Sequence, residues 1–176
     1  MDDTWRLVNG SELYNVRVDK RYVYIKAGTS HENPLRISSH DMLSDNMGNS
    51  WHQYGAVEAA EGSGIWKVEI VEEGDYSICL RRFPRESGWG FNAQFPETPK
   101  SIELERSMPA CKQVGFVEAS LYIADFSKVL AIDEEAEEVE FSMHLHPGKY
   151  DMEAILKDKE GSIHPAYFVY LEKVNR

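Results

Sequence analysis

The 176-residue sequence predicts an all-β fold, an antiparallel β-sandwich or jelly roll with little helix. Many segments are rich in β-branched and aromatic residues, and in several of them apolar and polar residues alternate. Gly, Pro, Asn and Asp separate these segments at short intervals. Helical periodicity is weak, and its best candidate, Ile132–Val139, reads at least as well as a short acidic loop that enters the next strand.

The first expected element is a hairpin in WRLVNGSELYNV, from Trp5 to Val16. A two-residue Asn9-Gly10 loop suits a type I′ turn, because both central positions need a positive φ. Further strands are expected at six places: Tyr22–Ile25, Ile65–Val71, Tyr76–Phe83, Val117–Ile123, Val139–Leu145 and Ala166–Leu171.

Two more hairpins are expected in Ile65–Phe83, turning at residues 72–75, and in Phe141–Leu156, turning at Pro147-Gly148. The first of them offers one inward face made of Trp66, Val68, Ile70, Tyr76, Ile78 and Leu80. Between the two hairpins, Pro84–Pro99 is long, rich in Gly and Pro, and carries several aromatic residues. Loops of this length are often functional or mobile.

Composition excludes several classes of function. A formal net charge of −11 argues against a nucleic-acid or anionic-membrane binder, because phosphates demand clustered Lys and Arg. Membrane insertion is not expected, since the longest apolar runs are far shorter than a bilayer span. Met1-Asp2-Asp3 does not begin a signal peptide, so we expect either a cytosolic protein or one whose leader was removed.

The two cysteines, Cys79 and Cys111, indicate little about function. They could form one disulfide, but neither lies in a metal-spaced motif. Because Cys79 alternates with apolar neighbours in a strand-like run, a buried free thiol is the favoured interpretation.

Two histidine motifs are candidates for chemistry. His144-Leu145-His146 places two imidazoles on one face of a strand, which makes half of a metal site. With no third ligand spaced nearby, solvent-facing polar positions beside a turn are the favoured interpretation, and we expect no metal. His40-Asp41 is a short acid–imidazole pair, but adjacent strand side chains point to opposite faces, so no Ser-His-Asp triad is implied.

Arginines and tryptophans provide a candidate ligand-binding surface. Arg81, Arg82 and Arg85 suit bidentate capture of sulfate, phosphate or carboxylate, although residues 81 and 82 should point to opposite faces of their strand. The favoured alternative is an Arg–Glu network that ties the strand end to the long loop. Trp51 and Trp89, in Gly/Asn-rich contexts, are the candidates for stacking on a sugar, whereas Trp66 fits the core. His40 and Asp41 complete the candidate ligand-binding set.

The segment TWRLVNGSELYNV resembles the end of the catalytic domain of bacterial arylsulfatases, and the rest of the chain resembles the additional C-terminal β-sandwich of a subset of them. The matching pieces are ENPLRISSHDM (32–42), SWHQ (50–53), GIWKVEIVEEGDYSICLRRFPRE (64–86), ASLYIADFSKVLAIDEEAEEVEFSMHLHPG (119–148) and AYFVYLEKV (166–174). The resemblance implies a terminal hairpin at 1–18 and a β-sandwich domain at 19–176.

The catalytic motif of that family is missing from this chain. Sulfatases convert the first residue of C/S-x-P/A-x-R to formylglycine, and neither Cys79 nor Cys111 starts such a motif. The Asp/Asn set that holds the catalytic calcium is absent too. The resemblance therefore implies no cofactor here, whereas the parent catalytic domain would use calcium and formylglycine. A second departure is that Val16 passes straight to Arg17, where the family usually carries a longer connector.

The resemblance implies a non-catalytic accessory domain of an arylsulfatase-like sulfuric ester hydrolase. We expect it to pack on the catalytic domain in cis and to help shape the substrate entrance. The alternative is a carbohydrate-binding module that contacts sulfated glycan through the Arg/Trp surface. The parent would be periplasmic or secreted, with a cytoplasmic location as the alternative.

Overall fold

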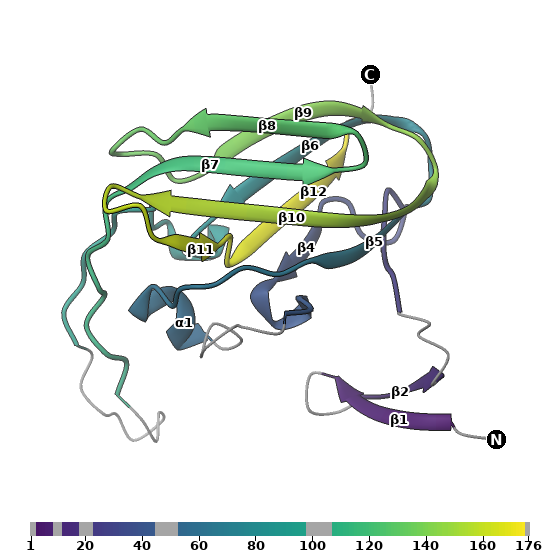
Figure 1. The fold of residues 1–176 in the computed structure, drawn as a ribbon, viewed down its shortest axis with the longest axis horizontal. Coiled ribbons are helices and arrows are strands. Elements are labelled where there is room, and N and C mark those ends of the chain that lie inside the picture. The colour runs from purple at the N-terminus through teal and green to yellow at the C-terminus, as the bar shows by residue number, and fades with distance from the viewer. Residues whose placement is uncertain (1–2, 9–11, 18–22, 45–52, 98–106, 175–176) are drawn as a thin grey trace.

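In the computed structural model, strands contain 48% of the residues and helices 8%. The structure describes residues 3–8, 12–17, 23–44, 53–97 and 107–174. Two β-sheets pack face to face and enclose one apolar core (Figure 1). The predicted all-β sandwich is therefore confirmed.

The larger sheet has six strands. Five follow the order β3-β5-β10-β7-β8, and the short β11 also pairs with β10. Their bounds are β3 Ile25–Ala27, β5 Trp66–Ile70, β7 Phe116–Ile123, β8 Phe126–Ala131, β10 Gly148–Asp158 and β11 Ile163–Pro165. All pairs are antiparallel except β3 with β5.

The smaller sheet is antiparallel throughout, in the order β4-β12-β6-β9. Its strands are β4 Leu35–Ser38, β6 Gly74–Arg81, β9 Val139–Leu145 and β12 Phe168–Lys173. Among the described residues, a two-stranded hairpin, one short helix and two 3-10 turns lie outside both sheets. These are β1 Asp3–Val8, β2 Glu12–Arg17, α1 Gln53–Glu58, η1 Ser39–Asp41 and η3 Arg85–Ser87. In the described part of the chain, no helix is long and apolar enough to cross a membrane.

The predicted inward face is confirmed. Its six side chains are all at most 1% exposed: Trp66, Val68, Ile70, Tyr76, Ile78 and Leu80. The first three come from β5 and the others from β6, so they line the core from opposite sheets. The indole nitrogen of Trp66 donates to the Ser38 carbonyl (2.8 Å), which satisfies the polar end of this buried ring.

The two hairpins predicted in Ile65–Phe83 and Phe141–Leu156 are wrong. In each case the first strand and the second strand belong to different sheets, and the connection between them crosses the edge of the sandwich. Period-two patterning shows which face of a strand is buried, but either sheet can bury that face against a shared core. The real partners are β5 with β10, where Ile70 lies opposite Gly148, and β6 with β9, where Gly74 lies opposite Leu145.

Other boundaries differ more modestly. The predicted strand Tyr22–Ile25 overlaps β3 only at Ile25, and Tyr22 lies outside the described residues. In the first hairpin Val8 lies opposite Glu12, and the expected Asn9-Gly10 turn lies outside the described residues. Residues 132–138 form a loop, in agreement with the acidic-loop interpretation. Helix α1 was not predicted from the sequence, because six residues are too few to show a helical period of hydrophobic residues.

Candidate functional site

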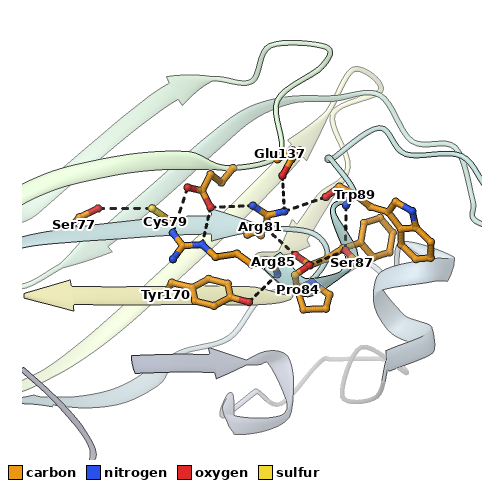
Figure 2. A network of polar contacts seen from close by, with 11 residues as sticks. Ser77, Cys79, Arg81, Pro84, Arg85, Ser87, Trp89, Glu137 and Tyr170 are labelled. Atoms are coloured by element: carbon orange, nitrogen blue, oxygen red, sulfur yellow. Dashed lines mark hydrogen bonds and ion pairs between the residues drawn. The ribbon is translucent and has the colours of Figure 1, made fainter. Parts of the chain in front are cut away.

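Arg81 and Arg85 share one carboxylate on the outer face of the smaller sheet. Arg81 Nη1 lies 2.9 Å from Glu138 Oε2, and Arg85 Nε lies 3.0 Å from the same oxygen. Arg85 Nη2 also donates to Glu138 Oε1 (3.3 Å), and Arg81 Nη2 pairs with Glu137 (3.3 Å). Figure 2 shows both arginines lying over the sheet beside Tyr170. Two guanidiniums and two carboxylates thus balance one another, which leaves no excess positive charge.

The titration properties of this network follow from its contacts. Burial raises the pKa of Glu138, but hydrogen bonds and charge from Arg85 and Arg81 outweigh it and hold that pKa below its usual value. Burial acts against the charge of Arg85 too, yet Glu138 keeps the pKa of Arg85 above its usual value. The Arg85–Glu138 ion pair is therefore charged at neutral pH.

The same network ties the end of β6 to the long loop. Arg81 Nε donates to the Phe83 carbonyl (3.0 Å), and Arg81 Nη2 donates to the Trp89 carbonyl (3.3 Å). The arginine side chain is only 3% exposed. Glu86, the acidic residue nearest in sequence, pairs instead with Arg36 of β4 (3.3 Å). Most donors of Arg81 are therefore engaged within the protein.

Arg82 points to the opposite side of the strand end, as the strand period predicts, and is fully buried. All four acceptors that the described residues give it are backbone carbonyls: those of Ala56 (2.9 Å), Val57 (3.2 Å), Phe91 (3.0 Å) and Lys112 (2.8 Å). Its guanidinium also lies 4.9 Å from the ring centroid of Phe83. Burial lowers the pKa of this arginine. Arg82 therefore joins α1 to the long loop and is closed to an external ligand.

Of the two tryptophans predicted to stack on a sugar, the structure describes only Trp89. Trp51 lies outside the described residues. Trp89 is 40% exposed and stacks on Phe95, with ring centroids 4.1 Å apart and planes 20° apart. Phe83 meets Trp89 edge to face at 5.4 Å. Trp89 therefore offers part of its ring to solvent, next to the arginine network that its own carbonyl joins.

His40 and Asp41 lie in the 3-10 turn η1, which is separated from β6 by β12. The Asp41 carboxylate accepts hydrogen bonds from the backbone amide (3.0 Å) and the hydroxyl (3.2 Å) of Ser38. Asp41 therefore shapes the turn after β4. The structure does not bring these two residues into the arginine network.

A second cluster surrounds the histidine pair. His144 Nε2 lies 3.2 Å from Glu73 Oε1, His144 Nδ1 lies 3.0 Å from Asp75 Oδ1, and His146 Nδ1 lies 3.3 Å from the same Glu73 oxygen. Hydrogen bonds that His144 donates to Asp75 and then to Glu73 raise the pKa of His144. The hydrogen bond from His144, and next the charge of His146, lower the pKa of Glu73.

Sequence reasoning found the histidines of this cluster and missed its acids. Glu73 and Asp75 are about seventy residues away in the chain, and the signal that would have found them is the pairing of β6 with β9, which sets Asp75 opposite His144. Glu73, His144 and His146 are the one group among the described residues whose ligand atoms are placed to hold a metal, all within 4.8 Å of one another.

Both cysteines are buried and free, as expected for Cys79.

Comparisons with known proteins identify no family. No family model matches the chain, and no curated protein matches its sequence. One similar solved structure is the crystal structure of a ruminal GH26 endo-beta-1,4-mannanase, with a TM-score of 0.40 and 9% identity. The match covers 88% of this chain and 28% of that protein. A similarity this low assigns neither ancestry nor activity.

Proposed function

We propose that this chain is a non-catalytic accessory domain of an arylsulfatase-like sulfuric ester hydrolase. In this role it packs on the catalytic domain in cis and helps to shape the substrate entrance. The observation that carries the proposal is the resemblance of its sequence segments, above all residues 64–86 and 166–174, to the C-terminal sandwich of such enzymes. The parent enzyme would use calcium and formylglycine, and a periplasmic or secreted location fits it best.

The state of the arginines supports a docking or structural role over glycan capture. Arg82 is fully buried against backbone carbonyls, and Arg81 is buried against Glu137 and Glu138. A sulfate group would have to displace Glu137 and Glu138 from Arg81, or leave the buried carbonyls around Arg82 unpaired. Each unpaired buried carbonyl costs about 1–3 kcal/mol, which is more than a surface ion pair returns. Arg85 and Trp89 are the more exposed members of the candidate surface, so a glycan would have to bind through them.

The gene sequence tests whether this chain belongs to a sulfatase. We expect the reading frame upstream of these residues to encode a C/S-x-P/A-x-R motif and the Asp/Asn calcium ligands. The purified chain alone should release no sulfate from aryl or sugar sulfates. An upstream frame without that motif, or sulfate release that a substitution in this chain abolishes, would contradict the proposal.

Docking is tested by hydrogen exchange. We expect backbone amides on one continuous face of the sandwich to exchange more slowly in the full-length protein than in the isolated chain, because a packed interface excludes water. Equal exchange rates over the whole sandwich in both samples would show that it does not dock.

The binding-module alternative is tested by titrating sulfated oligosaccharides against the wild type and an Arg85→Ala, Trp89→Ala double variant. Arg36→Ala is the matched control, because Arg36 is also exposed and paired with one glutamate. No binding by the wild type at millimolar ligand is the result that we expect. Binding that the double variant loses and the control keeps would favour the glycan module.

A further inference from the structure

The cluster of Glu73, His144 and His146 lies where two chain connections run side by side. The β5–β6 connection carries Glu73, and the β9–β10 connection carries His146. Because β5 pairs with β10 and β6 pairs with β9, both connections cross from sheet to sheet at the same end of the sandwich. Figure 1 shows the long curve from β9 to β10 at this end. The fold thus brings the three side chains together from two separate segments.

The distances between these side chains suit one small cation. In a tetrahedral zinc site, metal–ligand distances of about 2.0–2.2 Å place neighbouring ligand atoms roughly 3.3–3.6 Å apart. Glu73 Oε1 lies 3.2 Å from His144 Nε2 and 3.3 Å from His146 Nδ1, which are two such edges. All three ligand atoms lie within 4.8 Å of one another. Since all three side chains are exposed, small χ rotations can close the remaining edge.

We propose that Glu73, His144 and His146 bind a divalent transition-metal ion, with zinc as the best match. Two imidazole nitrogens and one carboxylate oxygen are ligands typical of zinc, whereas calcium and magnesium prefer oxygen alone. Three protein ligands leave the fourth position for water or for a group from a partner. The net charge of −11 also draws cations toward the chain.

Asp75 supplies the contact that orients one ligand. With His144 Nε2 directed at the metal, its Nδ1–H donates to Asp75 Oδ1, 3.0 Å away. Such a carboxylate–histidine contact fixes the tautomer and the ring orientation of a ligating imidazole. Asp75 is therefore a positioning residue. The bound ion would clamp the two connections together, a role independent of whether the parent is a sulfatase.

The proposal is tested by calorimetric titration of zinc into the untagged, chelator-treated chain at pH 7.5. We expect one zinc per chain and an increase in Tm that EDTA reverses, because an ion bound only to the folded state stabilises it. Calcium and magnesium should neither bind tightly nor raise the Tm. Cobalt should give the visible absorption of a tetrahedral site.

Matched variants separate this site from weak surface binding. Glu73→Gln and His144→Gln, both at exposed positions, should abolish the zinc-dependent increase in Tm while circular dichroism stays unchanged. Asp75→Asn should weaken zinc binding roughly 10–100-fold, as expected for an orienting partner. His40→Gln, at the other end of the smaller sheet, is the control and should bind like the wild type. Equal zinc binding by wild type and Glu73→Gln, or no zinc-dependent increase in Tm of the wild type, would overturn the proposal.

Discussion

Arg85 is held by Tyr170 in two ways. Its guanidinium carbon lies 4.4 Å from the centroid of the Tyr170 ring, and its backbone amide donates to the Tyr170 hydroxyl (3.0 Å). The ring and the hydroxyl therefore fix both the side chain and the main chain where β6 gives way to the long loop. With Glu138 on its other side, Arg85 belongs to a closed structural network more than to an open binding surface.

This double contact predicts a graded effect of substitution. Tyr170→Phe keeps the ring beneath Arg85 but removes the acceptor of its amide, so it should lower the free energy of unfolding by about 1 kcal/mol. Tyr170→Leu also loses the cation–π contact, worth about 0.5–1 kcal/mol more. Urea unfolding of the three proteins measures the difference. A Phe variant as unstable as the Leu variant would show that the ring contributes nothing.

Substitution of the buried arginine should cost far more than substitution of an exposed one. Arg82→Met leaves four carbonyls without their partner, and each unpaired buried group costs about 1–3 kcal/mol, partly offset because a cation is no longer buried. We expect the free energy of unfolding to fall by roughly 3 kcal/mol.

Arg36→Met, at an exposed ion pair with Glu86, is the matched control and should change stability by less than about 0.5 kcal/mol. Denaturant unfolding measures both variants. Similar losses in the two would contradict the anchoring role of Arg82.

Gly28 should tolerate no side chain. Its φ is +76°, and a Cβ atom there would clash with the hydroxyl of Tyr76, which is buried and held by the Glu72 carbonyl (2.7 Å). Gly88 has a similar φ of +66° with nothing within 4 Å of its Cβ position. Gly88→Ala should cost about 1–2 kcal/mol for the backbone alone, and Gly28→Ala should cost clearly more by thermal unfolding. Equal losses would show that the clash is relieved.

The sequence predicted which side chains are buried better than it predicted which strands pair with each other. Alternation placed Trp66 and Ile78 correctly in the core, and the same period placed Arg81 and Arg82 on opposite faces. These are properties of one strand, and they follow from residues two positions apart.

Which sheet a strand joins depends on pairing between distant segments, and the local pattern carries no signal for it. For this reason β5–β6 and β9–β10 looked like hairpins. The candidate site shows the same limit. Glu138 lies more than fifty residues beyond Arg81 and Arg85, and Glu73 lies about seventy residues before His144, so the acidic partners in both clusters were missed.

Glu138 should make the stability of the protein depend on pH in the acid range. The pKa of Glu138 is lower in the folded protein than its ordinary value of 4.5, so near that pH the unfolded chain binds more protons than the folded one. The stabilisation from Glu138 is therefore fully present above about pH 4.5 and is lost as the pH falls through the lower, folded pKa. Glu138→Gln mimics the protonated acid, so wild type and variant should differ most at neutral pH and converge in acid. Chemical unfolding from pH 7 to pH 3 measures this difference directly and cancels the contribution of other carboxylates, such as Asp158.

Glu160→Gln, in the exposed β10–β11 turn, is the control and should show a small difference at every pH. A gap between wild type and Glu138→Gln that is equally large at both ends of the range would mean that the Arg81–Glu138–Arg85 contacts do not stabilise the charged carboxylate.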